Sequence, residues 1–392
     1  MTNEVNIDVA LHPAQIEVWD AQARFNVVDC GRRWGKTESA KGIIADEYVN
    51  YGLPIAYTCP TYKMLADFWR ATKSTFYDVI VEVNESEKRL MFDGGMQLDF
   101  WSLDNYDAMR GRKYRKVIID EAAMVANLEE AWTMAIRPTL SDFKGGAWFF
   151  STPKGRNYFY DLYKRGMDGG EWKSFKYPTS SNPYIDADEI EAARYDLPSI
   201  VFQQEYLAEF VDDQGALVKR EHLRYFDEIP KGLTIGMGVD LAISKGTHAD
   251  YTAVAVVGYD RDSGNRYVLD VLRKQVGFHD VVELIKSMAA KWNPKRIYIE
   301  QVQYQAAVVQ ELLRKTNLPV KGITPDKDKV TRFHTILARY EQGLVHHRNG
   351  LPREFEQELL SFPIGDHDDM VDALVYADMC ATKTESTGVV WL

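Results

Sequence analysis

The triplet Gly35, Lys36 and Thr37 has the residue types that bind the phosphates of a nucleotide. The lysine would reach the β- and γ-phosphates, and the threonine hydroxyl would hold Mg²⁺. The general phosphate-binding loop has a glycine five positions before Gly35. This chain has Cys30 there, and its glycine stands one step later, at Gly31. The triplet alone is a weak signal, so its meaning depends on the features around it.

Two arginines, Arg32 and Arg33, lie inside this loop. A guanidinium in a phosphate loop can stabilise charge on the γ-phosphate, as an arginine finger acting in cis. We place both arginines at the nucleotide and favour Arg32 as the catalytic one. The alternative for one of the two is an ordinary surface charge or a contact to DNA.

An apolar strand predicted at Lys116–Asp120 ends in two acidic residues. Asp120 would hold the magnesium ion, directly or through water, and Glu121 would polarise the water that attacks the γ-phosphate. Before the first predicted strand, Gln15 could pair with the edge of an adenine base. Each feature also has an ordinary explanation, as a strand-end acid or a surface glutamine.

A third strand predicted at Ala147–Ser151 ends in the polar pair Ser151 and Thr152. A pair in this place would sense the γ-phosphate, although Ser-Thr-Pro can also be a plain turn. Because the loop, the acidic pair and this polar pair follow one another on alternating strands, together they predict an ATPase site.

A second group of acidic residues lies in the C-terminal half. Asp240 and Glu300 end apolar strands. Asp368, Asp369 and Asp372 stand at the start of a helix, and residues three or four positions apart lie on the same face of a helix. Acids at apolar strand ends are costly unless a positive partner is present, and none stands beside them in sequence. Oxygen ligands suit Mg²⁺ or Mn²⁺. Two such ions about 4 Å apart could activate water and stabilise the leaving oxygen of a phosphodiester.

These acids also have ordinary explanations. Strand-end acids occur in turns, and an acid at a helix start is often an N-cap. His248 and Asp250 precede the second strand of this half and could support a metal or DNA, with a plain loop role equally open. The recurrence of all three clusters in order favours a metal-dependent nuclease.

The elements that must position these residues alternate between strands and helices in the first half, which predicts a parallel α/β sheet. The predicted strands are Phe25–Asp29, Ile55–Cys59, Gln97–Ser102, Lys116–Asp120 and Ala147–Ser151, and the helices include Thr37–Tyr51, Tyr62–Tyr77 and Glu129–Arg137.

The second half begins again with strands in a meander, then a helix and another strand, an order typical of a ribonuclease H-like sheet. The predicted strands are Thr234–Asp240, Thr252–Tyr259, Arg266–Arg273 and Arg296–Glu300; the helices are Phe278–Trp292, Tyr304–Thr316, Lys329–Gln342 and one from Asp368. We predict an ATPase domain at 1–212 with a small helical lid at about 178–212, a linker at 213–231, and a nuclease domain at 232–392.

Length and composition agree with two globular domains: 392 residues, 45% of them hydrophobic and 27% charged. The net charge of −11 argues against a surface coated in basic residues, but a local basic groove suffices for nucleic acid. The three cysteines are far apart, which indicates a reducing cytoplasm. No apolar run is long enough to predict a membrane span, and the N-terminus is too polar for a signal peptide.

The stretches CGRRWGKT and VIIDEAA, joined to GVDLA, YIEQV and DHDDMVDAL, together resemble the large terminase subunit of tailed bacteriophages. The resemblance runs from about Leu11 to about Ala381 and rests on the joint pattern. It implies a P-loop ATPase domain of the additional-strand type followed by a ribonuclease H-like nuclease domain. The implied function is a viral DNA-packaging motor subunit, in which ATP hydrolysis drives double-stranded DNA into a procapsid and a metal-dependent endonuclease cuts concatemeric DNA.

The resemblance also implies roles for matched residues. Lys36 and Thr37 would bind phosphate and magnesium, and Asp120 and Glu121 would be the metal-binding acid and the catalytic acid. Ser151 and Thr152 would match the coupling motif. Asp240, Glu300 and Asp369 would form the nuclease triad, with Asp368 as the alternative third ligand. The implied cofactors are ATP with Mg²⁺, and Mg²⁺ or Mn²⁺ at the nuclease.

The implied partners are double-stranded DNA bound without sequence preference, the portal protein of the procapsid, a small terminase subunit and further copies in a ring, in the host cytoplasm. The alternative is a cellular ATP-dependent helicase or repair nuclease, which would need a second motor domain that this length does not offer. A non-enzymatic docking protein is disfavoured by the intact Lys36, Glu121 and carboxylate set.

Overall fold

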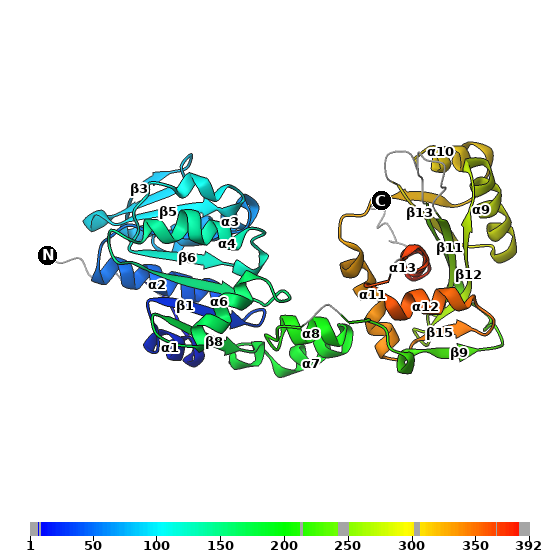
Figure 1. Ribbon diagram of the computed structural model, residues 1–392, viewed down its shortest axis with the longest axis horizontal. Coiled ribbons are helices and arrows are strands. Elements are labelled where there is room, and N and C mark those ends of the chain that lie inside the picture. Colours follow the sequence, from blue (N-terminus) through cyan, green and yellow to red (C-terminus); the bar gives the residue numbers. More distant parts are fainter. Residues whose placement is uncertain are drawn as a thin grey trace, which may run out of the picture. The chain divides into compact units, whose positions relative to one another are not determined.

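The structure is a computed structural model that describes residues 7, 9–211, 215–241, 251–301, 306–365 and 367–383. The chain divides into two units (Figure 1). The first comprises Met1–Tyr195 and Ile200–Asp213, and the second comprises Asp196–Ser199 and Gln214–Leu392. His248 and Asp250 lie outside the described residues.

The first unit is built on an eight-stranded sheet with the order β3-β4-β5-β2-β6-β7-β1-β8. The strands from β5 to β8 in this order run parallel, while β3 and β4 form an antiparallel edge. Because β7 lies between β1 and β6, the predicted additional-strand arrangement is confirmed. The strands are β1 (Phe25–Cys30), β2 (Ile55–Cys59), β3 (Ile80–Asn84), β4 (Arg89–Phe92), β5 (Gln97–Ser102), β6 (Lys116–Asp120), β7 (Gly146–Ser151) and β8 (Trp172–Tyr177).

Helices cover both faces of this sheet, because successive side chains of a strand point to opposite faces. On β1, Val28 and Cys30 pack in one apolar cluster and Phe25 and Val27 in another. The helices that precede α7 are α1 (Pro13–Asp20), α2 (Lys36–Asn50), α3 (Tyr62–Thr75), α4 (Leu128–Glu130), α5 (Arg137–Thr139) and α6 (Tyr158–Met167), with a π-helical turn at Ala131–Ile136 between α4 and α5. Two further helices, α7 (Ala187–Asp196) and α8 (Ser199–Glu205), follow the last strand of this sheet.

The second unit has a seven-stranded sheet with the order β14-β13-β10-β11-β12-β15-β9. Its centre is the antiparallel meander β10-β11-β12, and its other pairings are parallel. This is the predicted ribonuclease H-like sheet. The strands are β9 (Arg224–Phe226), β10 (Thr234–Asp240), β11 (Tyr251–Tyr259), β12 (Arg266–Gln275), β13 (Arg296–Glu300), β14 (Val320–Ile323) and β15 (Val345–Arg348).

In the described part of the second unit, α9 and α10 flank the sheet on one side and α11, α12 and α13 on the other (Figure 1). Apolar side chains of α9 and α10 pack with Met237 and Val239 of β10. The helices are α9 (Phe278–Trp292), α10 (Ala306–Lys315), α11 (Lys329–Glu341), α12 (Arg353–Ser361) and α13 (Asp369–Thr382).

The small residues of β10 allow α13 to lie directly on the strand. A Cβ atom on Gly236 would lie 2.5 Å from the main-chain oxygen of Ala377, and one on Gly238 would collide with the main-chain oxygen of Ala373. Since these glycines alternate with Met237 and Val239, Asp240 points to the same side of the sheet as the glycines, toward α13.

The structure differs from the sequence-based expectations mainly at the sheet edges. Strands β3, β4, β8, β14 and β15 were not predicted. The predicted linker 213–231 contains β9, which pairs in parallel with β15 and so belongs to the second sheet. These strands are short or carry many exposed residues, so they lack the apolar run that identified the central strands.

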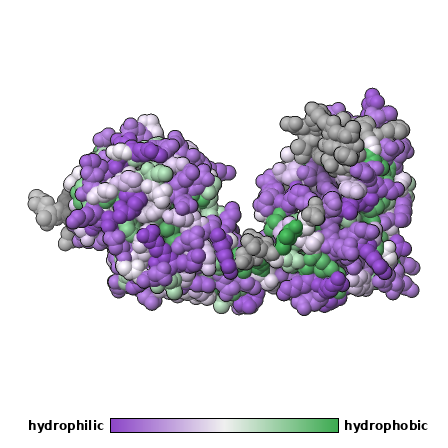
Figure 2. Space-filling model, viewed as in Figure 1, coloured by the Kyte–Doolittle hydropathy of each residue, from purple (hydrophilic) through white to green (hydrophobic). Residues whose placement is uncertain are grey.

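The visible face of both units is mostly hydrophilic (Figure 2). Within the described part of the chain, none of the helices has the length and apolar character needed to cross a bilayer. The cysteines Cys30, Cys59 and Cys380 are buried as free thiols.

The close contact at Gly238 gives a stability prediction. Gly238→Ala should lower the free energy of unfolding by about 2–3 kcal/mol or more, because main-chain atoms of α13 cannot move aside as a flexible side chain can. The midpoint of thermal unfolding should fall by roughly 5–10 °C.

Gly215→Ala is the matched control, since nothing lies within 4 Å of a Cβ there, and its effect should stay within about 0.5 kcal/mol. Equal melting of the Gly238→Ala variant and the unchanged chain would show that α13 is not seated on β10 as described.

Candidate functional sites

The loop between β1 and α2 has the backbone form of a phosphate-binding loop. Arg33 and Gly35 adopt positive φ angles of 62° and 109°. Helix α2 begins at Lys36, so its free N-terminal amides face the loop, as amides must to bind an anion. Thr37 lies exposed in the first turn of α2.

Lys36 and Glu121 form an ion pair with a distance of 3.2 Å between Nζ and Oε1. Burial alone would lower the pKa of Lys36, but its acidic neighbours outweigh burial and raise the pKa above the ordinary value. Glu121 has a left-handed backbone with φ 49° and ψ 43°, which costs a non-glycine residue roughly 1–2 kcal/mol. Such strain is typical of functional residues, and here it directs the carboxylate toward the lysine.

Asp120, at the end of β6, is buried beside Glu121. Its Oδ2 accepts a hydrogen bond of 2.6 Å from the Tyr57 hydroxyl, and its Oδ1 accepts one of 3.0 Å from the Glu121 amide. Burial, and then the Glu121 charge, raise the pKa of Asp120. The structure therefore brings Lys36, Asp120 and Glu121 together. Tyr57 was missed, because an isolated strand tyrosine carries no sequence signal.

Gln15 holds the loop in place. Its Nε2 donates to the Gly35 carbonyl at 2.8 Å and to Ser39 Oγ at 3.0 Å, while its Oε1 accepts from the His12 amide at 2.8 Å. The Gln15 amide thus contacts the loop and α2. An additional contact with adenine stays a prediction.

The two loop arginines differ in their surroundings. Arg32 is exposed, and its Nε lies 2.8 Å from Glu205 Oε2 at the end of α8. The main-chain carbonyls of Arg32 and Arg33 accept hydrogen bonds of 2.7 Å from Thr179 Oγ1 and Asn182 Nδ2. The segment after β8 therefore anchors the loop, a role that its sequence did not reveal. A catalytic role for either arginine stays a prediction.

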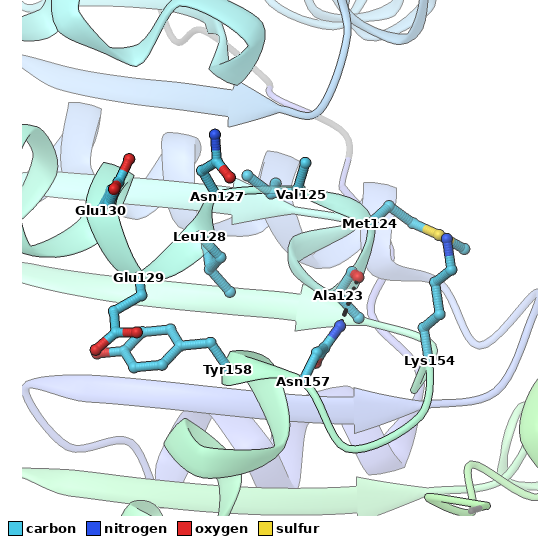
Figure 3. A pocket seen from close by; sticks show the side chains of 11 residues that line it. Ala123, Met124, Val125, Asn127, Leu128, Glu129, Glu130, Lys154, Asn157 and Tyr158 are labelled. Carbon is cyan, nitrogen blue, oxygen red and sulfur yellow. Dashed lines mark hydrogen bonds between the residues drawn. The ribbon is translucent and has the colours of Figure 1, made fainter. Parts of the chain in front are cut away.

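Ser151, at the end of β7, connects to the loop after β6. Its Oγ accepts a hydrogen bond of 3.1 Å from the Ala123 amide. Asn157 Nδ2 donates to the Ala123 carbonyl at 2.8 Å (Figure 3). Both main-chain groups of Ala123, two residues after Glu121, are thus held by the segment that begins at β7. The neighbouring Thr152 is buried.

A pocket of about 580 Å³ lies beside this connection. Figure 3 shows that it is lined from two sides, by the segment after Glu121 and by the segment after β7. The lining residues are Ala123–Glu130, Lys154, Asn157 and Tyr158.

Arg137 follows the acidic strand β6 in sequence but lies away from this nucleotide site. Its guanidinium carbon is 5.0 Å from the centre of the Phe25 ring, at the start of β1. The phosphate loop follows the other end of β1, roughly 17 Å away at about 3.3 Å per residue. Arg137 therefore cannot act on the nucleotide of its own chain from this position.

In the second unit, the ligand oxygens of Asp240, Glu300 and Asp372 lie within 4.8 Å of one another. Asp240 and Glu300 end the parallel neighbours β10 and β13, and Asp372 comes from the first turn of α13. The strand ends meet at one edge of the sheet, and the α13–β10 contact brings the third carboxylate to them.

Two basic residues of α11 and one tyrosine of α13 surround this cluster. Arg332 donates to Asp372 Oδ1 at 2.9 Å and also to the Tyr376 hydroxyl. That hydroxyl donates to Glu300 Oε2 at 2.6 Å. Lys329 Nζ lies 3.2 Å from Asp372 Oδ2. The spacing of Lys329 and Arg332, three apart on one helix, is the sequence signal that could have found them.

Asp240 is the least compensated carboxylate of the cluster. Burial, then Asp372 and Glu300, raise its pKa well above the ordinary value. Among the ion pairs of the described residues, none includes Asp240. A buried carboxylate between two others fits a divalent cation, and the all-oxygen donor set suits Mg²⁺ or Mn²⁺.

The structure groups Asp372, and not Asp369, with the two strand acids. Asp368 precedes α13, where its Oδ1 lies 2.6 Å from Lys329 Nζ. Asp369 is close enough to raise the pKa of Asp240 further. A ligand role for Asp368 or Asp369 stays a prediction.

The N-terminus of α13 is held by Glu358 of α12. One carboxylate oxygen accepts hydrogen bonds from the amides of Met370 at 2.7 Å and Val371 at 3.1 Å, and the other lies 3.0 Å from Arg273. A carboxylate at a helix N-terminus is favourable, and this one fixes the turn that carries Asp372.

Comparisons with known proteins agree with this architecture. Residues 29–224 match the family model described as "Terminase large subunit, T4likevirus-type, N-terminal", and residues 237–380 match "Terminase RNaseH-like domain". The large terminase subunit of Escherichia phage T5 is 27% identical over 266 residues, 64% of this chain and 60% of that protein. That of Thermus virus P23-45 is 24% identical over 387 residues, 85% and 77% of the two chains.

A solved structure shares the fold over nearly its whole length. The large terminase of a thermophilic bacteriophage superposes with a TM-score of 0.68 at 14% identity, covering 93% of this chain and 97% of that one. These matches favour the packaging family over the alternative of a cellular helicase or repair nuclease.

Asp29 gives a prediction for the pH dependence of stability. Burial raises its pKa to about 8 against the pull of Lys176 and Lys36, and neither carboxylate oxygen has a hydrogen-bond partner. Between about pH 4 and pH 8 the folded chain keeps a proton that the unfolded chain has lost, so stability falls as pH rises. Asp29→Asn removes this loss.

Near pH 4 the free energy of unfolding of Asp29→Asn should equal that of the unchanged chain. Above pH 8 it should be higher by on the order of a few kcal/mol. Urea unfolding of the first unit at pH 5 and pH 8.5 measures the difference. If the difference in free energy of unfolding between the two chains did not grow from pH 5 to pH 8.5, the buried, unpaired state of Asp29 would be contradicted.

Proposed function

This chain belongs to the large terminase subunits of bacteriophages, and we propose that it packages DNA, with an ATPase in its first unit and a metal-dependent endonuclease in its second. The single observation that carries the proposal is the presence of two separate charged centres. One is the Lys36–Glu121 pair at a phosphate-binding loop, and the other is the trio of half-buried Asp240 and Glu300 with buried Asp372.

In the first centre, the loop amides and Lys36 bind the phosphates of ATP, and Thr37 and Asp120 hold Mg²⁺. Mg²⁺ held by these residues would supply positive charge opposite the charge that develops on the phosphates. Glu121 leaves Lys36 when the phosphates take its place and then orients the attacking water. Arg32, which is exposed and pairs with Glu205 in this structure, is the arginine that we assign to the γ-phosphate, and it would leave Glu205 to reach it. The large terminase of the thermophilic bacteriophage has also been solved in complex with ADP, which supports the nucleotide assignment.

Hydrolysis reaches the rest of the unit through Ser151 and Thr152. The Ser151–Ala123 and Asn157–Ala123 hydrogen bonds connect β7 to the segment that follows Glu121. A shift of Glu121 on hydrolysis would thus move the segment after β7. This connection supports the predicted role of Ser151 and Thr152 in coupling hydrolysis to movement.

In the second centre, Asp240, Glu300 and Asp372 hold Mg²⁺ or Mn²⁺. A divalent cation held there would supply the positive charge that acidifies a water and stabilises the leaving oxygen of a phosphodiester. Arg332 and Tyr376 orient two of the three carboxylates, so the set is held before the cation arrives.

The substrate is double-stranded DNA, gripped by its phosphate backbone without reading of sequence, since a motor must slide along it. The assembly comprises a ring of copies on the portal protein of the procapsid, with a small terminase subunit that selects the DNA. Arg137, remote from its own nucleotide, is available to the neighbouring subunit of such a ring.

Glu121→Gln should lower the rate of ATP hydrolysis by about 10²-fold or more, because the amide cannot accept a proton from water. Nucleotide affinity should stay within a few-fold, since Lys36 is freed from its ion pair. Glu82→Gln, an exposed change on β3, is the control. Hydrolysis that persists in Glu121→Gln would remove Glu121 from the mechanism.

Asp240→Asn and Glu300→Gln should each abolish Mn²⁺-dependent cleavage of plasmid DNA while ATP hydrolysis continues. The chain should stay folded, because removing the Asp240 charge relieves a buried repulsion. Asp262→Asn, in the exposed turn between β11 and β12, is the control. Cleavage that survives both changes would show that this cluster is not the nuclease site.

A further inference from the structure

Tyr57 carries a hydroxyl that the packing of its ring does not require. Strand β2 is buried along its whole length, and Tyr57 is 3% exposed. Its ring stacks on Phe68 of α3, with 3.8 Å between the ring centroids, and makes a tilted contact with Phe100 of β5 at 5.9 Å. A phenylalanine would make the same two contacts. Because a buried hydroxyl costs free energy unless it has a partner, its presence indicates an interaction outside the apolar cluster.

The partner of this hydroxyl is Asp120, at the end of the neighbouring strand. Strands β2 and β6 run in parallel, and Tyr57 pairs in register with Ile118, which belongs to the same apolar cluster. Residues two apart on a strand face the same side, so Asp120 lies on the face of Ile118 and Tyr57, one step nearer the end of the sheet. The phenol ring spans this step, and its hydroxyl donates to Asp120 Oδ2 at 2.6 Å.

The hydroxyl of Tyr57 fixes the orientation of the Asp120 carboxylate. The other oxygen, Oδ1, accepts a hydrogen bond of 3.0 Å from the amide of Glu121, the next residue in the chain. Lys36 forms its ion pair with Glu121. Among the side chains that the structure describes, the Tyr57 hydroxyl is therefore the donor that holds Asp120. Rotation of the carboxylate would break both hydrogen bonds at once.

The fold, and not Asp120, sets the position of this hydroxyl. The Tyr57 ring is enclosed by Phe68 and Phe100, and all three belong to one buried cluster. Because protein interiors are closely packed, an enclosed ring keeps its rotamer. The donor thus stays in place whether or not a nucleotide is bound, and the carboxylate orients to it.

A fixed orientation matters for the ion that we assign to Asp120. A carboxylate has about four lone-pair sites, so roughly two stay available to a cation or to a water bound to it. Mg²⁺ requires nearly octahedral geometry with ligands at about 2.0–2.1 Å, so a carboxylate that can rotate binds it less well. Loss of a hydrogen-bond partner from a metal-binding group typically costs about 10–100-fold in metal affinity or activity.

We propose that Tyr57 is a positioning residue of the nucleotide site, whose hydroxyl holds Asp120 in the orientation that receives the Mg²⁺ of bound ATP. The inference rests on the proposed ATPase function. Tyr57 acts only through Asp120 and does not itself contact the nucleotide. Its hydroxyl should therefore matter for ATP bound with Mg²⁺ and not for ATP bound without it, since Lys36 and the loop amides bind the phosphates in both cases.

The test measures how tightly the full chain binds a fluorescent, non-hydrolysable ATP analogue, once with Mg²⁺ and once with EDTA in its place. Tyr57→Phe removes the hydroxyl and keeps the ring. With EDTA, its Kd should equal that of the unchanged chain. The ratio of the Kd with EDTA to the Kd with Mg²⁺ should fall by about 10-fold, and KM for ATP hydrolysis with Mg²⁺ should rise by a similar factor.

A second comparison asks whether the effect passes through Asp120. Asp120→Asn should lower the same ratio by itself, and Tyr57→Phe added to it should lower the ratio no further, because two changes to one contact are not additive. Tyr114→Phe is the matched control. It removes a buried hydrogen bond of the same kind, 2.7 Å from the Tyr114 hydroxyl to Asp99 Oδ2, before the start of β6 and away from Asp120. Its ratio should equal that of the unchanged chain.

Three results would overturn the role of Tyr57. The first is a ratio in Tyr57→Phe within about twofold of that of the unchanged chain. The second is an equal loss of affinity with and without Mg²⁺, which would indicate general damage to the phosphate loop. The third is a further fall in the double variant. If Asp120→Asn itself keeps the full ratio and hydrolyses ATP normally, the proposed ATPase function of this centre fails, which is a distinguishable result.

Discussion

The burial of neighbouring carboxylates is the constraint on which both centres depend. Asp120 and Glu121 lie together at one strand end, and Asp240 and Glu300 lie at two adjacent ones. Like charges in a poorly solvated place repel each other, so each group needs positive charge nearby. Lys36 meets part of this need in the first unit by its ion pair with Glu121. The negative charge that remains unbalanced attracts a metal ion. The carboxylates are therefore already in place before a ligand binds.

The surrounding fold serves to hold these charges in place. In the second unit, the glycines of β10 let α13 approach the strand, and Glu358 fixes the first turn of α13. In the first unit, Gln15 and the segment after β8 hold the phosphate loop by its main chain. Rigid positioning matters because a cation is bound well only when its ligands are already near their bonding distances.

The sequence was sufficient for the residues that stand on regular elements. Asp240 and Glu300 were found because each ends an apolar strand, and the loop at Lys36 because its residue types follow one another. Contacts between distant segments were not predictable. The place of Asp372 beside the strand acids, and not Asp369, depends on how α13 lies on β10. Single residues such as Tyr57 gain meaning only from their neighbours in space.

We expect the second unit to hold a divalent cation between the carboxylates of Asp240, Glu300 and Asp372. Anomalous diffraction from crystals of the full chain soaked in Mn²⁺ would locate this ion. We expect a peak bonded to oxygens of these three residues, at about 2.1–2.2 Å as for hard cations of this size. A map with no peak beside Asp240, or with a peak bonded to Asp369 in place of Asp372, would contradict it.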